Sequence, residues 1–222
     1  MTFENKDYFS RHKYRKPEDY AVKSYVTPKI DFIAKTICLK NPSIKILDVG
    51  SGNGTFSFYF KEYTNNITCV DYSYNLLKNN PVNFKVLASA YDLPIRDGYF
   101  DIVFEANLLH HLDHPEEAIE EMLRCSSKYL IFIEPNKYNP LMYLFGLLVP
   151  SEKGMLFSDI KKWRTIIKSQ NISIISSSIT GMVSQQNTPS FMVPLLKFFD
   201  FNFLFGEYII LVCKKDEVKN EK

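Results

Sequence analysis

Short apolar runs alternate with stretches of helical periodicity along most of the chain. Continuous apolar runs of four or five residues predict buried strands, and apolar positions three or four residues apart predict helices. The predicted strands cover residues 45–49, 67–70, 84–87, 100–104 and 129–133. The predicted helices between them cover residues 56–63, a segment through Leu76 and Leu77, and residues 115–125. This alternation predicts an α/β fold in which helices cover both faces of a mostly parallel sheet.

The two ends of the chain follow other patterns. Residues 1–28 are polar and rich in aromatic side chains, and residues 28–39 have helical spacing, which predicts an arm that leads into a first helix. Beyond residue 136 the pattern predicts an apolar segment at 137–158, a helix at 159–169, and strands at 172–179 and 208–213 with a phenylalanine-rich stretch between them. Two further strands bring the predicted sheet to seven.

The composition is that of one globular domain. With 222 residues, of which 45% are hydrophobic and 23% charged, the chain can fill one core, whereas two separate domains would each be small. A net charge of +2 is too close to zero to suggest nucleic acid as a partner. We therefore expect a single domain and no nucleic-acid partner.

The cysteines and the N-terminal residues bear on the compartment. The four cysteines are scattered, without a CxxC pair or a histidine at metal-ligand spacing, which predicts reduced thiols and no metal site. The first residues lack the apolar core of a signal peptide, and the longest apolar stretch, residues 141–149, is too short to cross a bilayer. We expect a cytoplasmic protein without a membrane span; its oligomeric state is left open.

A glycine-rich loop, GSGNGT, separates the first predicted strand from the next helix. Gly50, Gly52 and Gly54 let the backbone approach a ligand and turn amide groups toward it. Asp48, just before the loop, would repel a pyrophosphate but can pair with the ammonium group of an amino acid. The third glycine also falls one position earlier than in the dinucleotide fingerprint, which disfavours a nicotinamide-dependent dehydrogenase.

Asp71 ends the second predicted strand, about twenty positions after the loop. A carboxylate at this place commonly accepts hydrogen bonds from ribose hydroxyl groups. The alternative is an aspartate that only begins a loop. The glycine loop upstream makes the ribose contact the better interpretation.

With these features in place, the segment LPIRDGYFDIVFEANLLHHLDHPEEAIEEMLR resembles the class I S-adenosylmethionine-dependent methyltransferases, in the type 11-like group that carries LPxxDxxFDxV followed by LHHL. The resemblance runs from about residue 46 to residue 136. It implies a Rossmann-like fold with seven strands, the last antiparallel, and S-adenosylmethionine as the cofactor, with S-adenosylhomocysteine as the product. The single domain, residues 1–222, would comprise an N-terminal arm and helix (1–40), a cofactor-binding core (45–136), and variable inserts (137–165 and 180–207).

The resemblance also implies which residues bind the cofactor. Carried over to this chain, they are Asp48, Gly50, Ser51, Gly52, Asp71, Tyr72, Ser89, Ala90, Glu105 and Ala106. The glycine loop would wrap the methionine part of the cofactor, with Asp48 near its ammonium group. Asp71 would hold the ribose and Tyr72 would cover the adenine, while residues 105–107 fall where the family lines the methyl-transfer site.

The adenine contact departs from the family pattern. The family usually has an aspartate followed by alanine after the third strand, where this chain has Ser89 and Ala90. A serine hydroxyl can accept a hydrogen bond but lacks the charge, so we expect a weaker contact unless Asp92 takes its place. This departure is the best support for a binding module that keeps the fold without catalysis.

Three residues are candidates for acid–base catalysis: His110, His111, and Glu134, which follows the fifth predicted strand. A hydroxyl or protonated amine acceptor needs a group that removes its proton, whereas a carboxylate or thiolate does not. In the family the paired histidines commonly belong to a helical turn that supports the site. We therefore give the structural interpretation more weight than the catalytic one.

We expect the binding pocket for the methyl acceptor to be built from the segments outside the shared core. These are the inserts after the fifth and sixth strands and the aromatic arm residues Tyr8, Phe9, Tyr14 and Tyr20. Their composition predicts a small, apolar acceptor; a protein or nucleic-acid acceptor is the alternative, although FEANLL stands where enzymes that methylate base amino groups carry (D/N)PPY. Residues 141–149 and 191–205 would form a lid or contact a membrane surface, or else pack in the core or a dimer interface.

Overall fold

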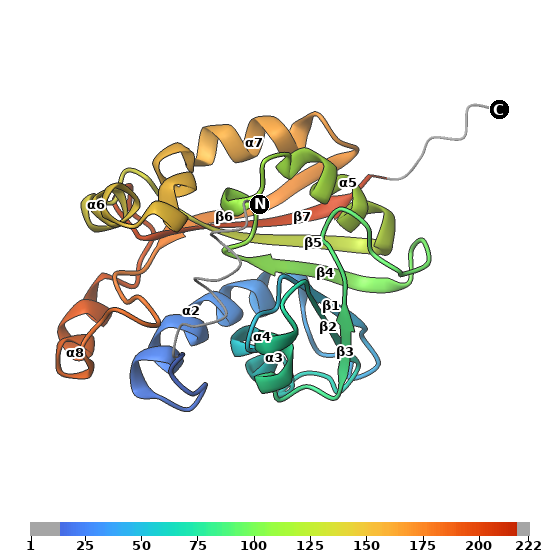
Figure 1. The fold of residues 1–222 in the computed structure, drawn as a ribbon, viewed down its shortest axis with the longest axis horizontal. Helices are drawn as coiled ribbons and strands as arrows, with labels where there is room; N and C mark the ends of the chain where they lie inside the picture. Colours follow the sequence, from blue (N-terminus) through green and yellow to red (C-terminus); the bar gives the residue numbers. More distant parts are fainter. Residues whose placement is uncertain (1–13, 217–222) are drawn as a thin grey trace.

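The computed structural model describes residues 14–216, which form a seven-stranded sheet between two layers of helices (Figure 1). The strands are β1 (Ile46–Val49), β2 (Ile67–Asp71), β3 (Phe84–Leu87), β4 (Phe100–Ala106), β5 (Ser126–Pro135), β6 (Ile172–Thr180) and β7 (Tyr208–Lys215). The helices are α2 (Tyr20–Ile37), α3 (Thr55–Phe60), α4 (Tyr74–Asn79), α5 (Pro115–Cys125), α6 (Pro140–Leu148), α7 (Ile160–Lys168) and α8 (Val193–Leu196). Short 3-10 turns add η1 (Leu109–His111), η2 (Pro150–Phe157), η3 (Ser190–Met192) and η4 (Lys197–Phe199).

The strands lie in the order β3-β2-β1-β4-β5-β7-β6. The first five are parallel, and β7 is inserted antiparallel between β5 and β6. The predicted fold class, with seven strands and the last one antiparallel, is confirmed. Because the chain order reverses between β1 and β4, a crevice is expected at the carboxyl ends of these strands.

Burial on both faces explains why the strands are continuously apolar. In β1, Ile46 packs in a cluster with residues of α2 and α3, whereas Leu47 packs in a second cluster with residues of α5 and α7. The two clusters lie on opposite sides of the sheet, with α2, α3 and α4 on one side and α5 and α7 on the other (Figure 1). Apolar side chains are therefore needed at successive positions.

The first helix begins earlier than the pattern predicted. α2 starts at Tyr20, where Asp19 caps it by accepting a hydrogen bond from the N–H of Ala21. Pro28, at which the sequence suggested a start, lies inside this helix. An interior proline destabilises a helix by about 3 kcal/mol, and burial of the face that includes Val22 and Ile33 offsets this.

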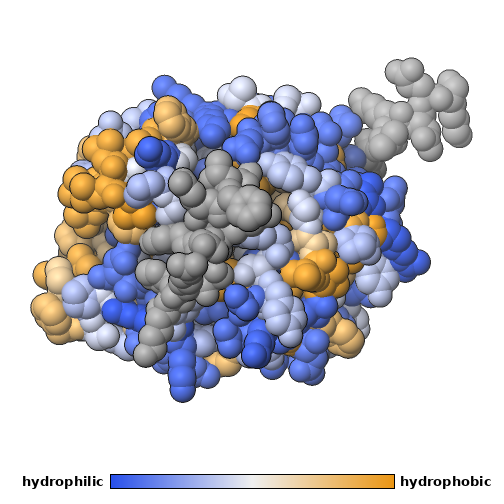
Figure 2. All heavy atoms as spheres, in the orientation of Figure 1, coloured by the Kyte–Doolittle hydropathy of each residue, from blue (hydrophilic) through white to orange (hydrophobic). Residues whose placement is uncertain are grey.

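The inserts lie at one end of the molecule. α6 and α8 both lie beyond the left end of the sheet in Figure 1, and Figure 2 shows hydrophobic side chains gathered on this side. Many of these side chains are exposed: Leu141, Tyr143, Leu144, Leu147, Leu148, Phe157, Phe191, Leu195, Phe198, Phe199, Phe201, Leu204 and Phe205. Core packing is thus the wrong interpretation for most of these segments. Among residues 14–216, no helix combines the length and apolar character that crossing a bilayer requires.

Candidate active site

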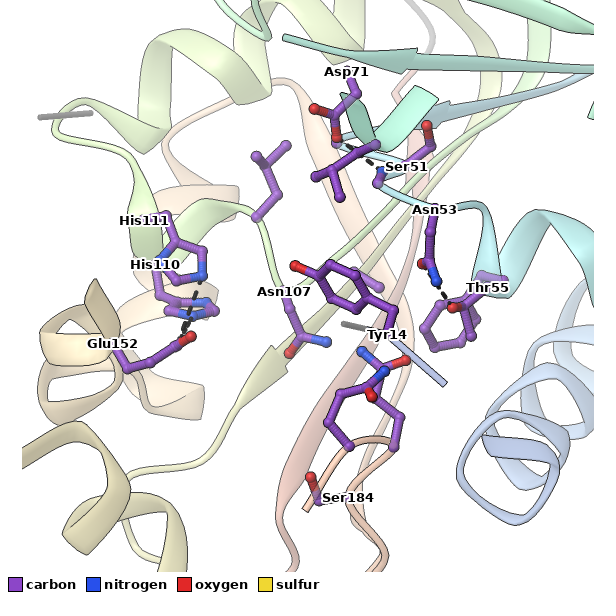
Figure 3. A pocket seen from close by; sticks show the side chains of 18 of the residues that line it. Tyr14, Ser51, Asn53, Thr55, Asp71, Asn107, His110, His111, Glu152 and Ser184 are labelled. Carbon is purple, nitrogen blue, oxygen red and sulfur yellow. Dashed lines mark hydrogen bonds and ion pairs between the residues drawn. The ribbon is translucent and has the colours of Figure 1, made fainter. Parts of the chain in front are cut away.

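A cavity of about 340 Å³ opens at the carboxyl ends of β1, β2 and β4. The core contributes Asp48, Asp71 and Ala106 at the strand ends, together with the glycine loop. The N-terminal arm and the inserts contribute Tyr14, Phe145, Glu152, Met155, Ser184, Gln185, Gln186 and Asn187. Figure 3 shows Asp71 and Ser51 at one end of this cavity and His110, His111 and Glu152 at the other.

The glycine loop between β1 and α3 has a left-handed backbone at each of its glycines. Gly50, Gly52 and Gly54 all have positive φ angles, of 69°, 52° and 77°, which only glycine adopts readily. A side chain at Gly54 would also collide with Asn80, 2.3 Å from its Oδ1 atom, whereas a Cβ at Gly52 would meet nothing closer than 4.0 Å. The loop therefore folds tightly and leaves the surface at Gly52 clear for a ligand.

Asp71 closes the cavity at the end of β2. Its carboxylate accepts hydrogen bonds from the N–H groups of Gly52 and Ser73, each at 2.8 Å. Burial raises the pKa of Asp71, although these backbone bonds act against it. Because a carboxylate offers about four lone-pair positions, Asp71 can still accept the hydroxyl groups of a ribose.

Asp48 lies at the base of the loop and is 2% exposed. The hydroxyl of Ser57 donates a hydrogen bond to it. Burial raises the pKa of Asp48 from 3.8 to about 7, even though this bond favours the charged form. A cationic ligand group would therefore stabilise the ionised carboxylate that burial disfavours.

A second cavity of about 230 Å³ shares Gly50, Asp71 and Tyr72 with the first. The predicted adenine contacts Ser89 and Ala90 both line it. The hydroxyl of Ser89 accepts a hydrogen bond from the N–H of Tyr91, while Asp92 is exposed and is not among the lining residues. The geometry thus favours Ser89 over Asp92 at this position.

Glu105 and Glu134 lie beneath the cavity and not on its wall. Glu105 accepts hydrogen bonds from the N–H groups of Leu108 and Ile133, and Glu134 accepts them from Leu109 and His110. Burial and the neighbouring Glu134 raise the pKa of Glu105 well above its usual range. Burial also disfavours the charged form of Glu134, but the facing His110 ring outweighs it and lowers the pKa of Glu134. Both carboxyl groups thus support the backbone that follows β4.

The histidine pair forms a cluster with a residue that the sequence did not reveal. Nδ1 of His110 lies 2.7 Å from Glu134, and the Nε2 atoms of His110 and His111 lie 3.5 and 3.7 Å from the same oxygen, Oε2, of Glu152. Burial lowers the pKa of His110, but Glu134 and Glu152 outweigh it and raise the value to about 9. Burial and the neighbouring His110 lower the pKa of His111 to about 4, so it is neutral at pH 7.

The part of the cavity wall that the inserts contribute is more polar than the sequence predicted. Ser184, Gln185, Gln186 and Asn187 contribute to it from the segment after β6, beside the apolar Phe145 and Met155. Of the predicted arm residues, Tyr14 lines the cavity, Tyr20 is 48% exposed and lies outside it, and Tyr8 and Phe9 fall outside the described residues. A polar run inside an insert carries no periodic signal, so only the structure brings it to the site.

Asn107 joins the site to the N-terminal helix. It follows β4 with a positive φ of 59° and donates a hydrogen bond from Nδ2 to the hydroxyl of Tyr25, at 2.9 Å. Tyr25 is fully buried in α2, where Lys29 lies 3.7 Å from the centre of its ring. The helix outside the shared core therefore helps to position a residue of the cavity.

The strand order, the glycine loop after β1 and the aspartate that ends β2 define the class as a class I methyltransferase fold. Residues 47–131 match the family model described as a methyltransferase domain, and this match agrees with the resemblance to S-adenosylmethionine-dependent methyltransferases that the sequence carries. A malonyl-[acyl-carrier protein] O-methyltransferase from Buchnera aphidicola subsp. Baizongia pistaciae is 35% identical over 86 residues. This alignment covers 37% of the chain and only 35% of that relative.

Solved structures resemble the chain over most of its length. The YcgJ protein of Bacillus subtilis has a TM-score of 0.62 at 16% identity and covers 86% of this chain and 98% of its own. A possible histamine N-methyltransferase from Thermotoga maritima has a TM-score of 0.63 at 14% identity, and the match covers 89% of this chain and 99% of that structure. Magnesium protoporphyrin IX methyltransferase from Synechocystis, crystallised with S-adenosylhomocysteine, has a TM-score of 0.58 at 16% identity, with 96% and 94% covered. At these identities the likeness concerns the fold.

Proposed function

We propose that this protein binds S-adenosylmethionine in the cavity behind the glycine loop and transfers its methyl group to a small-molecule acceptor. The observation that carries the proposal is the arrangement of Asp48, the loop and Asp71 around one cavity. The buried Asp48 suits the ammonium group of the cofactor, and Asp71 suits its ribose. Tyr72, Ser89 and Ala90 surround the adjoining cavity, whose position suits the adenine.

The cofactor supplies a methyl group on a positively charged sulfur, which is already activated for displacement. The chain then mainly has to hold the acceptor at attack distance and exclude water. Ala106 and Asn107 lie on the cavity wall between the two ends, where the family lines the transfer site. Glu105 and Glu134, being beneath the wall, would act by positioning the backbone that carries these residues and the histidines.

The acceptor end of the cavity suits a small molecule with both apolar and polar groups. Phe145 and Met155 offer apolar contacts, and Gln185, Gln186 and Asn187 offer hydrogen bonds. A cavity of about 340 Å³ that also takes part of the cofactor leaves room for a small acceptor group. The Buchnera relative is by name an O-methyltransferase, which favours oxygen as the accepting atom. A protein or nucleic-acid acceptor would have to insert a single side chain or base.

Calorimetric titration with S-adenosylmethionine tests the cofactor assignment. We expect one site per chain and a loss of affinity of roughly 10- to 100-fold in Asp71→Ala, because a carboxylate that accepts hydroxyl hydrogen bonds contributes about 1.5–3 kcal/mol. Asp92→Ala is the matched control, since Asp92 also follows β3 near the second cavity but does not line it. Absence of binding, or equal affinity of Asp71→Ala and the wild type, would overturn the assignment.

A measurement of methyl transfer distinguishes a methyltransferase from a module that binds the cofactor without catalysis. Pools of small alcohols, phenols, thiols and carboxylic acids are incubated with the protein and methyl-labelled S-adenosylmethionine. We expect label to pass into one chemical class of acceptor. Tight cofactor binding without transfer to any pool would favour the non-catalytic alternative.

A further inference from the structure

His110, His111 and Glu152 bring three potential metal ligands to one point at the acceptor end of the cavity. One ligand atom from each, the Nε2 atoms of the histidines and a carboxylate oxygen, all lie within 4.8 Å of one another. Their side chains are 0%, 7% and 9% exposed, and all three residues line the cavity. The cluster is therefore buried on the protein side and open toward the space where an acceptor would bind.

The hydrogen bonds of the two rings fix which nitrogen of each ring could bind a metal ion. Nδ1 of His111 lies 3.1 Å from the carbonyl oxygen of Ser151, which can only accept, so Nδ1 carries the hydrogen. Nδ1 of His110 likewise donates to the carboxylate of Glu134 at 2.7 Å. Metal-binding histidines typically donate their second N–H to a carboxylate or a carbonyl in this way. Both Nε2 atoms are left facing Glu152.

The buried Nε2 atom of His110 is the second observation that points to a ligand. Within residues 14–216 it has no hydrogen-bond partner, and its nearest acidic atom is Oε2 of Glu152 at 3.5 Å. Two ligands at 2.0–2.1 Å from a tetrahedral zinc ion lie roughly 3.3 Å apart. The distances of 3.5 and 3.7 Å from the histidines to Glu152 are within a few tenths of an ångström of this spacing.

The backbone brings the two ligand segments unusually close. His110 and His111 are neighbours in η1, and Glu152 lies in η2, which packs against η1. Gly154 makes this approach possible, because a Cβ at that position would lie only 1.7 Å from the carbonyl oxygen of His110. The same contact places the carbonyl of Ser151 beside His111.

We propose that His110, His111 and Glu152 form a binding site for one divalent transition metal ion, best suited to zinc, whose remaining position faces the cavity. Two imidazoles and one carboxylate with an open position form the ligand set of catalytic zinc sites. Magnesium is disfavoured because it prefers oxygen ligands. The predicted absence of a metal site rested on sequence spacing, and Glu152 is 41 positions beyond His111 in a separate insert.

The metal would define the class of acceptor, and this part of the proposal rests on the proposed function. An acceptor hydroxyl or thiol that coordinates at the open position becomes a stronger acid. Its O–H or S–H bond breaks, the proton passes to solvent in the cavity, and the electron pair stays on the oxygen or sulfur. The bound anion is then the nucleophile for methyl transfer, so no side chain need act as the base.

Metal binding is tested without the cofactor. The purified full-length protein is treated with a chelator, dialysed, and titrated with zinc chloride by calorimetry, and the bound metal is counted by elemental analysis. We expect one zinc ion per chain, and at least about a tenfold weaker association in His111→Ala and in Glu152→Gln. Replacement by cobalt(II) should give the visible absorption bands of a four- or five-coordinate site in the wild type alone.

Two controls keep the outcomes separate. His114→Ala removes an exposed histidine three residues from the pair and should bind zinc as the wild type does. Circular dichroism and urea unfolding show that each variant is folded, and S-adenosylmethionine titration of the wild type is a separate measurement from the zinc titration. Absence of zinc binding in the wild type, or equal zinc binding in the wild type, His111→Ala and Glu152→Gln, would overturn the metal site and leave a buried ion pair. Loss of S-adenosylmethionine binding alone would overturn the proposed function and leave the metal site standing.

Discussion

Gly50 shows how a single missing side chain shapes the proposed cofactor site. Its φ of 69° is strained for any other residue, and it lines both cavities. A Cβ there would lie 2.9 Å from Cδ1 of Leu108. We expect Gly50→Ala to lose about 1–2 kcal/mol of stability because alanine disfavours this positive φ, and somewhat more because its Cβ collides with Leu108. We also expect its affinity for S-adenosylmethionine to fall at least about tenfold.

Gly98 provides the matched control for this prediction. It has a similar φ of 60° in the turn before β4, but nothing lies within 4 Å of an added Cβ. Gly98→Ala should therefore lose a similar amount of stability from the backbone and keep its cofactor affinity. Urea unfolding and calorimetric titration measure the two effects, and an equal loss of affinity in both variants would contradict the role given to Gly50.

Asp48 predicts a pH dependence of stability. Burial raises its pKa from 3.8 to about 7, so between these values the folded protein holds a proton that the unfolded chain has released. Stability then falls as the pH rises from about 4 to about 7, by on the order of 4 kcal/mol in all. Asp48→Asn has no carboxyl group to titrate and does not lose this stability. The difference between the free energies of unfolding of Asp48→Asn and the wild type should therefore increase, in favour of the variant, by about 2–3 kcal/mol between pH 5 and pH 8.

Urea unfolding at several pH values checks this prediction. Asp92→Asn serves as the comparison, since Asp92 is exposed and its substitution should give a difference that varies little with pH. A difference between Asp48→Asn and the wild type that stays constant from pH 5 to pH 8 would show that Asp48 is ionised in the folded protein throughout.

The sequence pointed to cavity residues at the carboxyl end of a strand and missed those whose place depends on tertiary packing. Asp48 and Asp71 were predictable because strand ends meet at one edge of a parallel sheet. Glu152 was not, because its place beside the histidines depends on the close approach of η2 to η1 at Gly154. No periodicity or spacing along the chain encodes such an approach.

At the scale of elements, the exposed hydrophobic end formed by α6 and residues 190–205 predicts contact with a membrane surface. Phe191 and Phe198 are 83% and 80% exposed, and large exposed apolar patches mark interaction sites. Residues 137–168 contribute six lysines or arginines against two acidic residues, a balance that suits anionic lipid. We expect the protein to float with vesicles that contain phosphatidylglycerol and less with phosphatidylcholine alone.

A double substitution tests whether these side chains are responsible. Phe191→Ser combined with Phe198→Ser should leave the protein in the lipid-free fraction. Phe84→Ser is the control, because Phe84 is 65% exposed but lies in β3, at the opposite edge of the sheet from β6. Recovery of the wild type only in the lipid-free fraction would reject membrane contact and favour an interface with another protein.

Most elements were predictable because burial on both faces gives each strand a short, continuous apolar run. The main error concerned α2, where Pro28 suggested a helix start and the true start is the Asp19 cap. Proline is favoured in the first turn of a helix, which is why Pro28 suggested a start. Burial of one face can nevertheless stabilise a helix that has a proline in its interior. The apolar positions before Pro28 were hidden among aromatic and charged residues of the arm.

At the scale of the whole molecule, a seven-stranded, mostly parallel sheet with its last strand antiparallel was predicted from the sequence, whereas the cavity is built from two sources. The proposed cofactor side comes from the core that matches the family model, residues 47–131. The proposed acceptor side comes from Tyr14, Glu152 and the polar residues 184–187, all outside that match. This division explains why the sequence led to a specific proposal for the cofactor and left the identity of the acceptor open.

The division of the cavity wall also bears on how such proteins diverge. On the proposed function, substitutions, insertions and deletions in residues 145–155 and 184–187 would change which molecule is methylated while the donor site stays intact. Two descendants of one ancestor would then keep nearly the same core and act on unrelated compounds. Grouping them by substrate would require comparison of these insert residues, because similarity in the core would report only a common donor.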